Sequence, residues 1–196
     1  MPDSTIKIVS PDWIHLLKIF CTQCDHGAVS YLTAGRKGVR KQGTDIITSA
    51  LDYLAGVANI NENHWISFII DGRAGMILVG DSLLDGGNAA LERGERGKTI
   101  NTLRWWIQQS WQLAGLPIRP IPASPLIVQR QQDSASCGIY AFNSIATFFK
   151  PKSHPRLALS SLRSTRARFF NNIVEYHHSV QVLCQICLNI NQSLLW

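Results

Sequence analysis

The sequence lacks any apolar run that approaches the ~20 residues needed to cross a lipid bilayer, so we expect no membrane contact. Its first ten residues lack the basic start and apolar stretch of a secretory signal. The five cysteines are an odd number, which does not indicate a complete disulfide framework. Together these absences favour a reducing compartment, and we expect a nuclear or cytoplasmic protein with free thiols.

The sequence also lacks internal repeats, low-complexity tracts and concentrated charge. The 196 residues suit a single domain, 1–196, with 45% hydrophobic and 16% charged residues. The net charge of +6 is scattered along the chain rather than gathered in a run. A modest basic excess favours acidic partner surfaces, so we expect a monomer that does not contact nucleic acid directly.

Helical patterns occur in several parts of the chain. Periodic apolar residues and start or stop signals predict helices at 11–20, 101–114, 138–149 and 158–177. Gly115 is expected to end the second of these, and Lys150-Pro151 the third. The basic, glycine-punctuated stretch 33–43 is typical of a solvated loop, as is 82–100.

Two β-rich runs, 65–70 and 75–80, flank the turn dipeptide Asp71-Gly72 and predict an antiparallel hairpin. Short extended segments are expected at 117–122 and 125–129. Helices and strands do not alternate regularly, so the pattern indicates an α+β domain rather than a βα array.

The hairpin places two chemically useful residues near each other. With its turn centred between Gly72 and Arg73, His64 lies directly opposite Asp81, with Cβ atoms ~4.5–5.5 Å apart. An imidazole–carboxylate hydrogen bond there would fix the tautomer of His64 and stabilise its imidazolium. Asp71, as a turn residue, and Asp85, in a glycine-rich loop, are weaker candidates for the acid.

Cys137 lies between a polar loop and the predicted helix 138–149. A thiol at a helix N-terminus feels the positive end of the helix dipole, which favours the thiolate. Gly138 leaves room for a substrate carbonyl. The loop before Cys137 carries amide side chains that could donate to a tetrahedral oxyanion, so the pattern predicts a cysteine nucleophile with His64 as its base.

Taken together, these residues resemble the ubiquitin-like protease family, the SUMO-specific cysteine proteases. The shared elements are Asn59-x-Asn61-x-x-His64-Trp65, Asp81-Ser82-Leu83, and Gln131 six residues before Cys137-Gly138-Ile139-Tyr140. The likeness is strongest over 57–149, with 1–56 expected to form the helical N-terminal part of the substrate cleft and 150–196 the C-terminal helices. It implies a papain-like fold with a central mixed or antiparallel sheet flanked by helices, and a cysteine at the start of a buried helix.

The resemblance also implies roles for individual residues. His64 is the general base, Asp81 orients it, Cys137 attacks, and Gln131 rather than its neighbours Gln129 and Gln132 donates to the oxyanion. Family members hold the Gly-Gly tail of their modifier in a tunnel roofed by tryptophans. Trp65 matches one of these and Trp13 is the candidate for the other. The family has an acidic residue shortly after its N-terminal tryptophan, which is absent here.

The implied function is that of a cysteine peptidase or isopeptidase, which cleaves after the C-terminal Gly-Gly of a ubiquitin-like modifier. Among these modifiers, SUMO is the one we expect. No metal or cofactor is implied. Four alternatives remain open: a deubiquitinase or deneddylase, a viral-type processing protease, an acyltransferase, and a catalytically degenerate module that binds a modifier. Two CxxC pairs, Cys21/Cys24 and Cys184/Cys187, could form a zinc site, but their helical context favours simple burial.

Overall fold

The computed structural model describes residues 4–25, 30–31, 37–84, 90–133, 135–158, 161–168 and 171. The chain divides into two compact units, Met1–Arg156 and Leu157–Trp196. In the second unit, residues 162–168 are helical, within the predicted helix 158–177. The sheet and the helices that cover it lie in the first unit.

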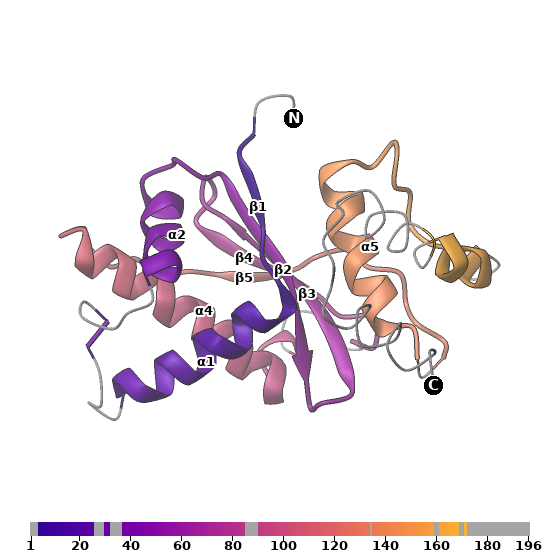
Figure 1. Ribbon diagram of the computed structural model, residues 1–196, viewed down its shortest axis with the longest axis horizontal. Helices are drawn as coiled ribbons and strands as arrows, with labels where there is room; N and C mark the ends of the chain where they lie inside the picture. Colours follow the sequence, from indigo (N-terminus) through magenta and orange to yellow (C-terminus); the bar gives the residue numbers. More distant parts are fainter. Residues whose placement is uncertain are drawn as a thin grey trace, which may run out of the picture. The chain divides into compact units, whose positions relative to one another are not determined.

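A five-stranded mixed sheet forms the centre of the first unit (Figure 1). Its order in space follows the sequence: β1 (Ile6–Ile8), β2 (Tyr53–Ile60), β3 (His64–Asp71), β4 (Met76–Gly80) and β5 (Ala123–Pro125). The three central strands are antiparallel, whereas each edge strand runs parallel to its neighbour. The segment 1–56, expected to be helical, therefore also contributes β1 and the start of β2.

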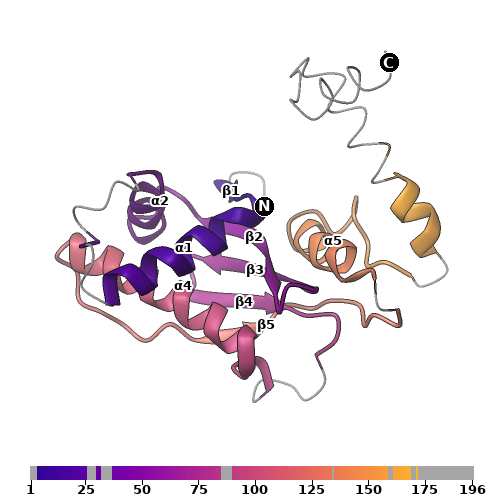
Figure 2. The same ribbon diagram turned by 60° about the horizontal axis from the view of Figure 1, so that its bottom comes forward.

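Helices cover both faces of this sheet (Figures 1 and 2). One face packs against α1 (Pro11–Asp25), α2 (Lys37–Ile47) and α4 (Gly94–Leu113), and the other packs against α5 (Cys137–Phe149). Alternate residues of β2 and β3 enter one core or the other, as the pleat requires. Leu54, Phe68 and Ile70 lie in the core under α1 and α4, while Ala55 and Ile69 lie in the core under α5.

The β3–β4 hairpin forms as predicted, but the register predicted from the sequence is wrong by two residues. Asp71 pairs with Met76 rather than with Ala74, and Ser67 pairs with Gly80. The turn is therefore longer than the tight one expected. The Asp71 carboxylate accepts hydrogen bonds from the backbone N–H groups of Arg73 (3.0 Å) and Ala74 (2.8 Å), which confirms Asp71 as a turn residue. A shift of two residues keeps each side chain on its original face.

The prediction of a loop over the basic stretch 33–43 is wrong for residues 37–43, which belong to helix α2. Gly43 lets α2 approach α4 closely, because a Cβ at this position would overlap the Ser110 hydroxyl and lie 3.3 Å from Trp106. The indole N–H of Trp106 donates to the backbone carbonyl of Val39 at 3.1 Å. The glycine, read as a loop signal, is a close-packing residue.

Helix α4 begins at Gly94, earlier than predicted, so the prediction of a loop over 82–100 is wrong for residues 94–100. Its end is confirmed: Gly115 has a φ of +66°, and the N–H of Leu116 donates to the carbonyl of Trp111 at 2.9 Å. This is the left-handed glycine stop that ends many helices. Helix α5 also confirms its prediction, and it ends before Lys150-Pro151.

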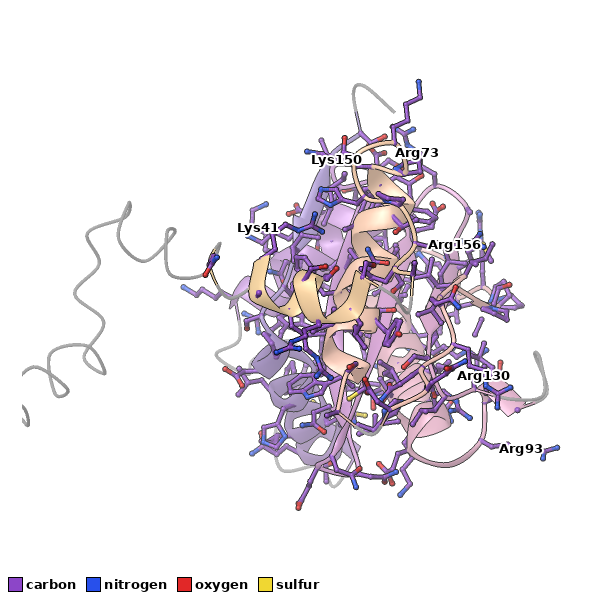
Figure 3. All side chains as sticks on the ribbon, turned by 90° about the vertical axis from the view of Figure 1, so that its right-hand side faces the viewer. Lys41, Arg73, Arg93, Arg130, Lys150 and Arg156 are labelled. Carbon is purple, nitrogen blue, oxygen red and sulfur yellow. The ribbon has the colours of Figure 1, made fainter. Side chains whose placement is uncertain are left out.

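The basic side chains are dispersed over this unit. Arg73 and Lys150 lie toward one end and Arg93 and Arg130 toward the other in Figure 3. Of the helices in the described ranges, none has the length and apolarity to span a bilayer.

The two glycines of α2 give a matched test of this packing. Gly38→Ala adds a methyl group in open space and should stabilise the protein by about 0.5–1 kcal/mol, the helix-propensity gain. Gly43→Ala adds it against Ser110 and Trp106, and should destabilise by roughly 1–3 kcal/mol through overpacking. Urea unfolding of both variants measures the difference; equal effects would contradict the close contact of α2 with α4.

Candidate active site

His64 and Asp81 are in direct contact at the open end of the hairpin. His64 is the first residue of β3 and Asp81 directly follows the last residue of β4. The imidazole Nε2 lies 2.7 Å from Asp81 Oδ1. Continuing the observed register would place Asp81 opposite Ile66, so the contact runs diagonally between positions on the same face.

The carboxylate of Asp81 is buried and fully engaged, with its side chain 1% exposed. Oδ1 also accepts the backbone N–H of Leu83 at 2.9 Å, and Oδ2 forms an ion pair with Arg96 of α4. Burial alone would raise the pKa of Asp81, but the hydrogen bonds from His64, Leu83 and Arg96 outweigh it and the pKa is lowered. Asp81 is therefore ionised at neutral pH.

This contact assigns separate tasks to the two imidazole nitrogens of His64. With Nε2–H donated to the carboxylate, the lone pair of Nδ1 is free of that interaction and can accept a proton from a nucleophile. The same hydrogen bond limits rotation of the ring. The pair therefore has the geometry of a base held by a carboxylate.

Cys137 is the first residue of α5 and is 5% exposed. Helix α5 packs on β3, where the hydroxyls of Ser67 and Ser144 lie 2.7 Å apart in the interior. At the start of the helix, a Cβ at Gly138 would lie 3.7 Å from the Trp65 indole. Since Trp65 follows His64 directly, this packing brings the strand that begins with His64 to the end of α5 that carries Cys137.

Gln131 is buried, at 5% exposed, and is tied to the residue next to Asp81. Its backbone N–H donates to the Ser82 carbonyl at 2.9 Å, and its side-chain oxygen accepts the Ser82 hydroxyl at 2.8 Å. The side-chain Nε2 donates to the carbonyl and carboxylate of Asp133. Gln131 can therefore serve an oxyanion only by exchanging Asp133 for the substrate.

Asp133 organises the loop before the cysteine. Its carboxylate accepts the backbone N–H of Ala135 (3.0 Å), the backbone N–H of Ser136 (2.8 Å) and the Ser136 hydroxyl (2.5 Å). The Ser136 side chain makes no capping bond to α5 itself. Asp133 thus fixes the approach of the chain to Cys137, a function that the sequence pattern did not reveal.

Trp13 lies apart from this group. It is 7% exposed in the core, 6.1 Å from the Phe68 ring and 5.1 Å from the Trp106 ring, centroid to centroid. Its indole N–H donates to the Gln42 side chain at 2.7 Å. This placement does not support the predicted tunnel role.

Trp65 has a more open setting. It lines a cavity of about 370 Å³ together with residues of α1 and of the β2–β3 turn, among them His15, Lys18 and Glu62. The indole of Trp65 thus faces open space on the side of α1, and its tunnel role stays a prediction.

The first CxxC pair lies within α1, where Cys21 and Cys24 are half-buried, while the second pair lies outside the described residues. Within the described ranges, no three His, Cys, Asp or Glu side chains are grouped so that they could hold a metal ion. Asp85, the other candidate acid, also lies outside the described residues.

Fold and site together define a papain-like cysteine peptidase architecture. The family profile described as "Ulp1 protease family, C-terminal catalytic domain" matches residues 6–181. The chain belongs to this family of cysteine peptidases, which confirms the resemblance read from the sequence, and the α+β papain-like fold is confirmed with it.

Solved structures agree with this fold. A de-sumoylating protease matches with a TM-score of 0.59 and 16% identity, over 93% of this chain and 77% of that one. The SUMO protease Ulp1, with its catalytic cysteine oxidised to a sulfonic acid, matches with a TM-score of 0.51 and 20% identity, over 82% of this chain. The matched part spans 65% of the length of that Ulp1 structure. A search of the curated proteins found no significant match.

The lowered pKa of Asp81 predicts a pH-dependent contribution to stability. A carboxylate whose pKa is lower in the folded than in the unfolded state stabilises the fold above its unfolded pKa, and this is lost as pH falls through the folded pKa. Asp81→Asn should therefore be less stable than wild type at neutral pH, and the difference in free energy of unfolding should narrow as the pH falls below about 4. Urea unfolding across pH 3–7 measures it; a constant gap would contradict the assignment.

Proposed function

We propose that the chain is an active cysteine peptidase and isopeptidase that cleaves after the C-terminal Gly-Gly of a ubiquitin-like modifier, with SUMO as that modifier. The observation that carries the proposal is the His64–Asp81 hydrogen bond of 2.7 Å, at the strand that packs on the helix beginning with Cys137. Two structural neighbours, a SUMO protease and a de-sumoylating protease, support the choice of modifier.

In the proposed reaction, Cys137 attacks the terminal glycine carbonyl of the modifier and its thiol proton passes to His64. Asp81 stabilises the resulting imidazolium. The imidazolium protonates the leaving lysine amine as the C–N bond breaks, which leaves a thioester on Cys137. His64, again neutral, takes a proton from water as it attacks the thioester, and the free modifier carboxylate and the thiol are released.

The oxyanion of each tetrahedral intermediate is proposed to bind Gln131 and a backbone N–H near Cys137. Such donors stabilise charge that develops only in the transition state. Gln131 is already held by Ser82, so its amide needs to leave only Asp133 to reach the oxyanion.

Selection of glycine follows from the packing at the start of α5. Gly138 has no side chain, and the Trp65 indole lies within van der Waals reach of its Cβ position. A substrate tail that runs over the Trp65 indole and past Gly138 approaches the start of α5 most closely when it carries no side chains, so a Gly-Gly tail is favoured.

Removing the nucleophile or the base tests the mechanism. Cys137→Ser and His64→Ala should each lower the turnover of a SUMO–fluorophore substrate by at least roughly a thousandfold without unfolding the protein. A parallel panel with NEDD8 and ubiquitin substrates tests the modifier. Full hydrolysis by Cys137→Ser would sink the mechanism, and a stronger response to ubiquitin or NEDD8 would replace SUMO as the substrate.

The glutamine prediction has a matched control in the next residue. Gln131→Ala should lower kcat by roughly a hundredfold, the usual effect of losing one oxyanion donor. Gln132→Ala removes an exposed amide of the same loop and should leave kcat unchanged. Comparable losses in both variants would show that the loop, rather than the Gln131 amide, is what matters.

A further inference from the structure

Asp81 has one partner, Arg96, that has no role in the proposed mechanism. The Arg96 side chain, 18% exposed, forms an ion pair with Asp81 Oδ2. The same guanidinium donates to the backbone carbonyls of Ala90 (2.9 Å) and Leu91 (3.3 Å). All three interactions hold it rigidly against the carboxylate that His64 uses.

The position of Arg96 on its own helix is electrostatically unfavourable. It is in the first turn of α4, where the helix dipole is positive and disfavours cations. A basic residue there needs a compensating partner, and the buried Asp81 carboxylate is that partner. The position of Arg96 is therefore explained by its ion pair with Asp81 rather than by stabilisation of α4.

The two partners of Asp81 compete for one negative charge. Oδ1 bonds His64 and Oδ2 bonds Arg96, so the carboxylate is already neutralised before His64 gains a proton. A buried carboxylate whose only partner is an imidazolium would stabilise that imidazolium strongly, since opposite charges attract more in a poorly solvated site. The imidazolium would then give up its proton less readily. Arg96 weakens that stabilisation and also fixes which oxygen faces His64.

We propose that Arg96 is a positioning residue of this peptidase, which holds Asp81 in register with His64 and limits how firmly the pair retains the catalytic proton. The inference rests on the proposed function. In that mechanism His64 must give its proton to the leaving amine and then act as a neutral base on water. Both steps slow when the imidazolium is too stable.

Arg104 of the same helix provides a matched control. It is 22% exposed, it pairs with the Glu92 carboxylate at 2.7 Å, and it donates to the Ile121 carbonyl at 2.8 Å. It resembles Arg96 in burial and in its contacts but does not touch Asp81 or His64. A purely structural role for either arginine would give both variants similar effects.

The first measurement needs no substrate. NMR titration of the histidine ring protons, with the His64 signal assigned through His64→Ala, follows protonation of that ring. The groups whose charge acts on it are Asp81 after β4, Arg96 of α4 and, in the proposed mechanism, Cys137 of α5. In Arg96→Gln the imidazolium should persist to a pH about one unit higher than in wild type, because a nearby positive charge is lost.

The conservative variant separates charge from hydrogen bonding. Arg96→Lys retains the positive charge and should titrate within a few tenths of a pH unit of wild type, as should Arg104→Gln. A wild-type titration in Arg96→Gln, or a shift in Arg96→Lys as large as in Arg96→Gln, would overturn the proposal. If Arg96→Gln does not fold, Arg96→Met, which also removes the charge but keeps the aliphatic stem, takes its place and should show the same shift.

The second measurement is turnover of the modifier substrate. Arg96→Gln should lower kcat roughly tenfold with KM within about twofold, while Arg104→Gln changes neither. An unchanged kcat in Arg96→Gln would overturn the catalytic part of the inference. If wild type hydrolyses no modifier, the proposed function fails, and the titration alone then tests whether Arg96 controls His64.

Discussion

The buried carboxylate of Asp81 is the interaction on which the site depends. Its two oxygens link the end of β4 to the first residue of β3 through His64, to the turn backbone through Leu83, and to α4 through Arg96. A charge this deeply buried is stable only with such partners, and removing one of them is costly. The sheet and the helical layer over it are thus held in register at the point where the imidazole must be oriented.

The second half of the site comes from the opposite face of the sheet. Trp65 points toward α5 because it is one residue after His64 in a pleated strand, and Gly138 packs near it. Ser67 and Ser144 fasten the same strand to the same helix. The base and the helix that carries the nucleophile therefore share one strand as their common support.

Much of this was open to prediction because the strongest signals were local. The β-rich runs, the Asp71 turn, the Gly115 stop and the cysteine before an apolar helix each depend on a few neighbouring residues. The contact of His64 with Asp81 survived an error in register, since a slip of two residues changes the partner but not the face. A slip of one residue would have separated them.

The rest depended on packing between distant segments. Gly43 was read as a loop residue, and only the close approach of α4 explains it; Trp13 was read as a tunnel residue, but Phe68 and Trp106 pack against it in the core. Arg96 lay in a stretch rich in glycine and charge, so its tie to Asp81 had no signal at the level of sequence. Only tertiary structure brings such pairs together.

The dipeptide Asp81-Ser82 carries one further consequence. Asp81 directly follows β4 and Ser82 lies in the turn that comes next, and one side chain serves the base while the other binds Gln131. The spacing between these two functions is therefore a single peptide unit. A deletion or insertion of one residue in the preceding strand would turn Asp81 away from the face that carries His64, so the length of β4 is as tightly constrained as the identity of Asp81.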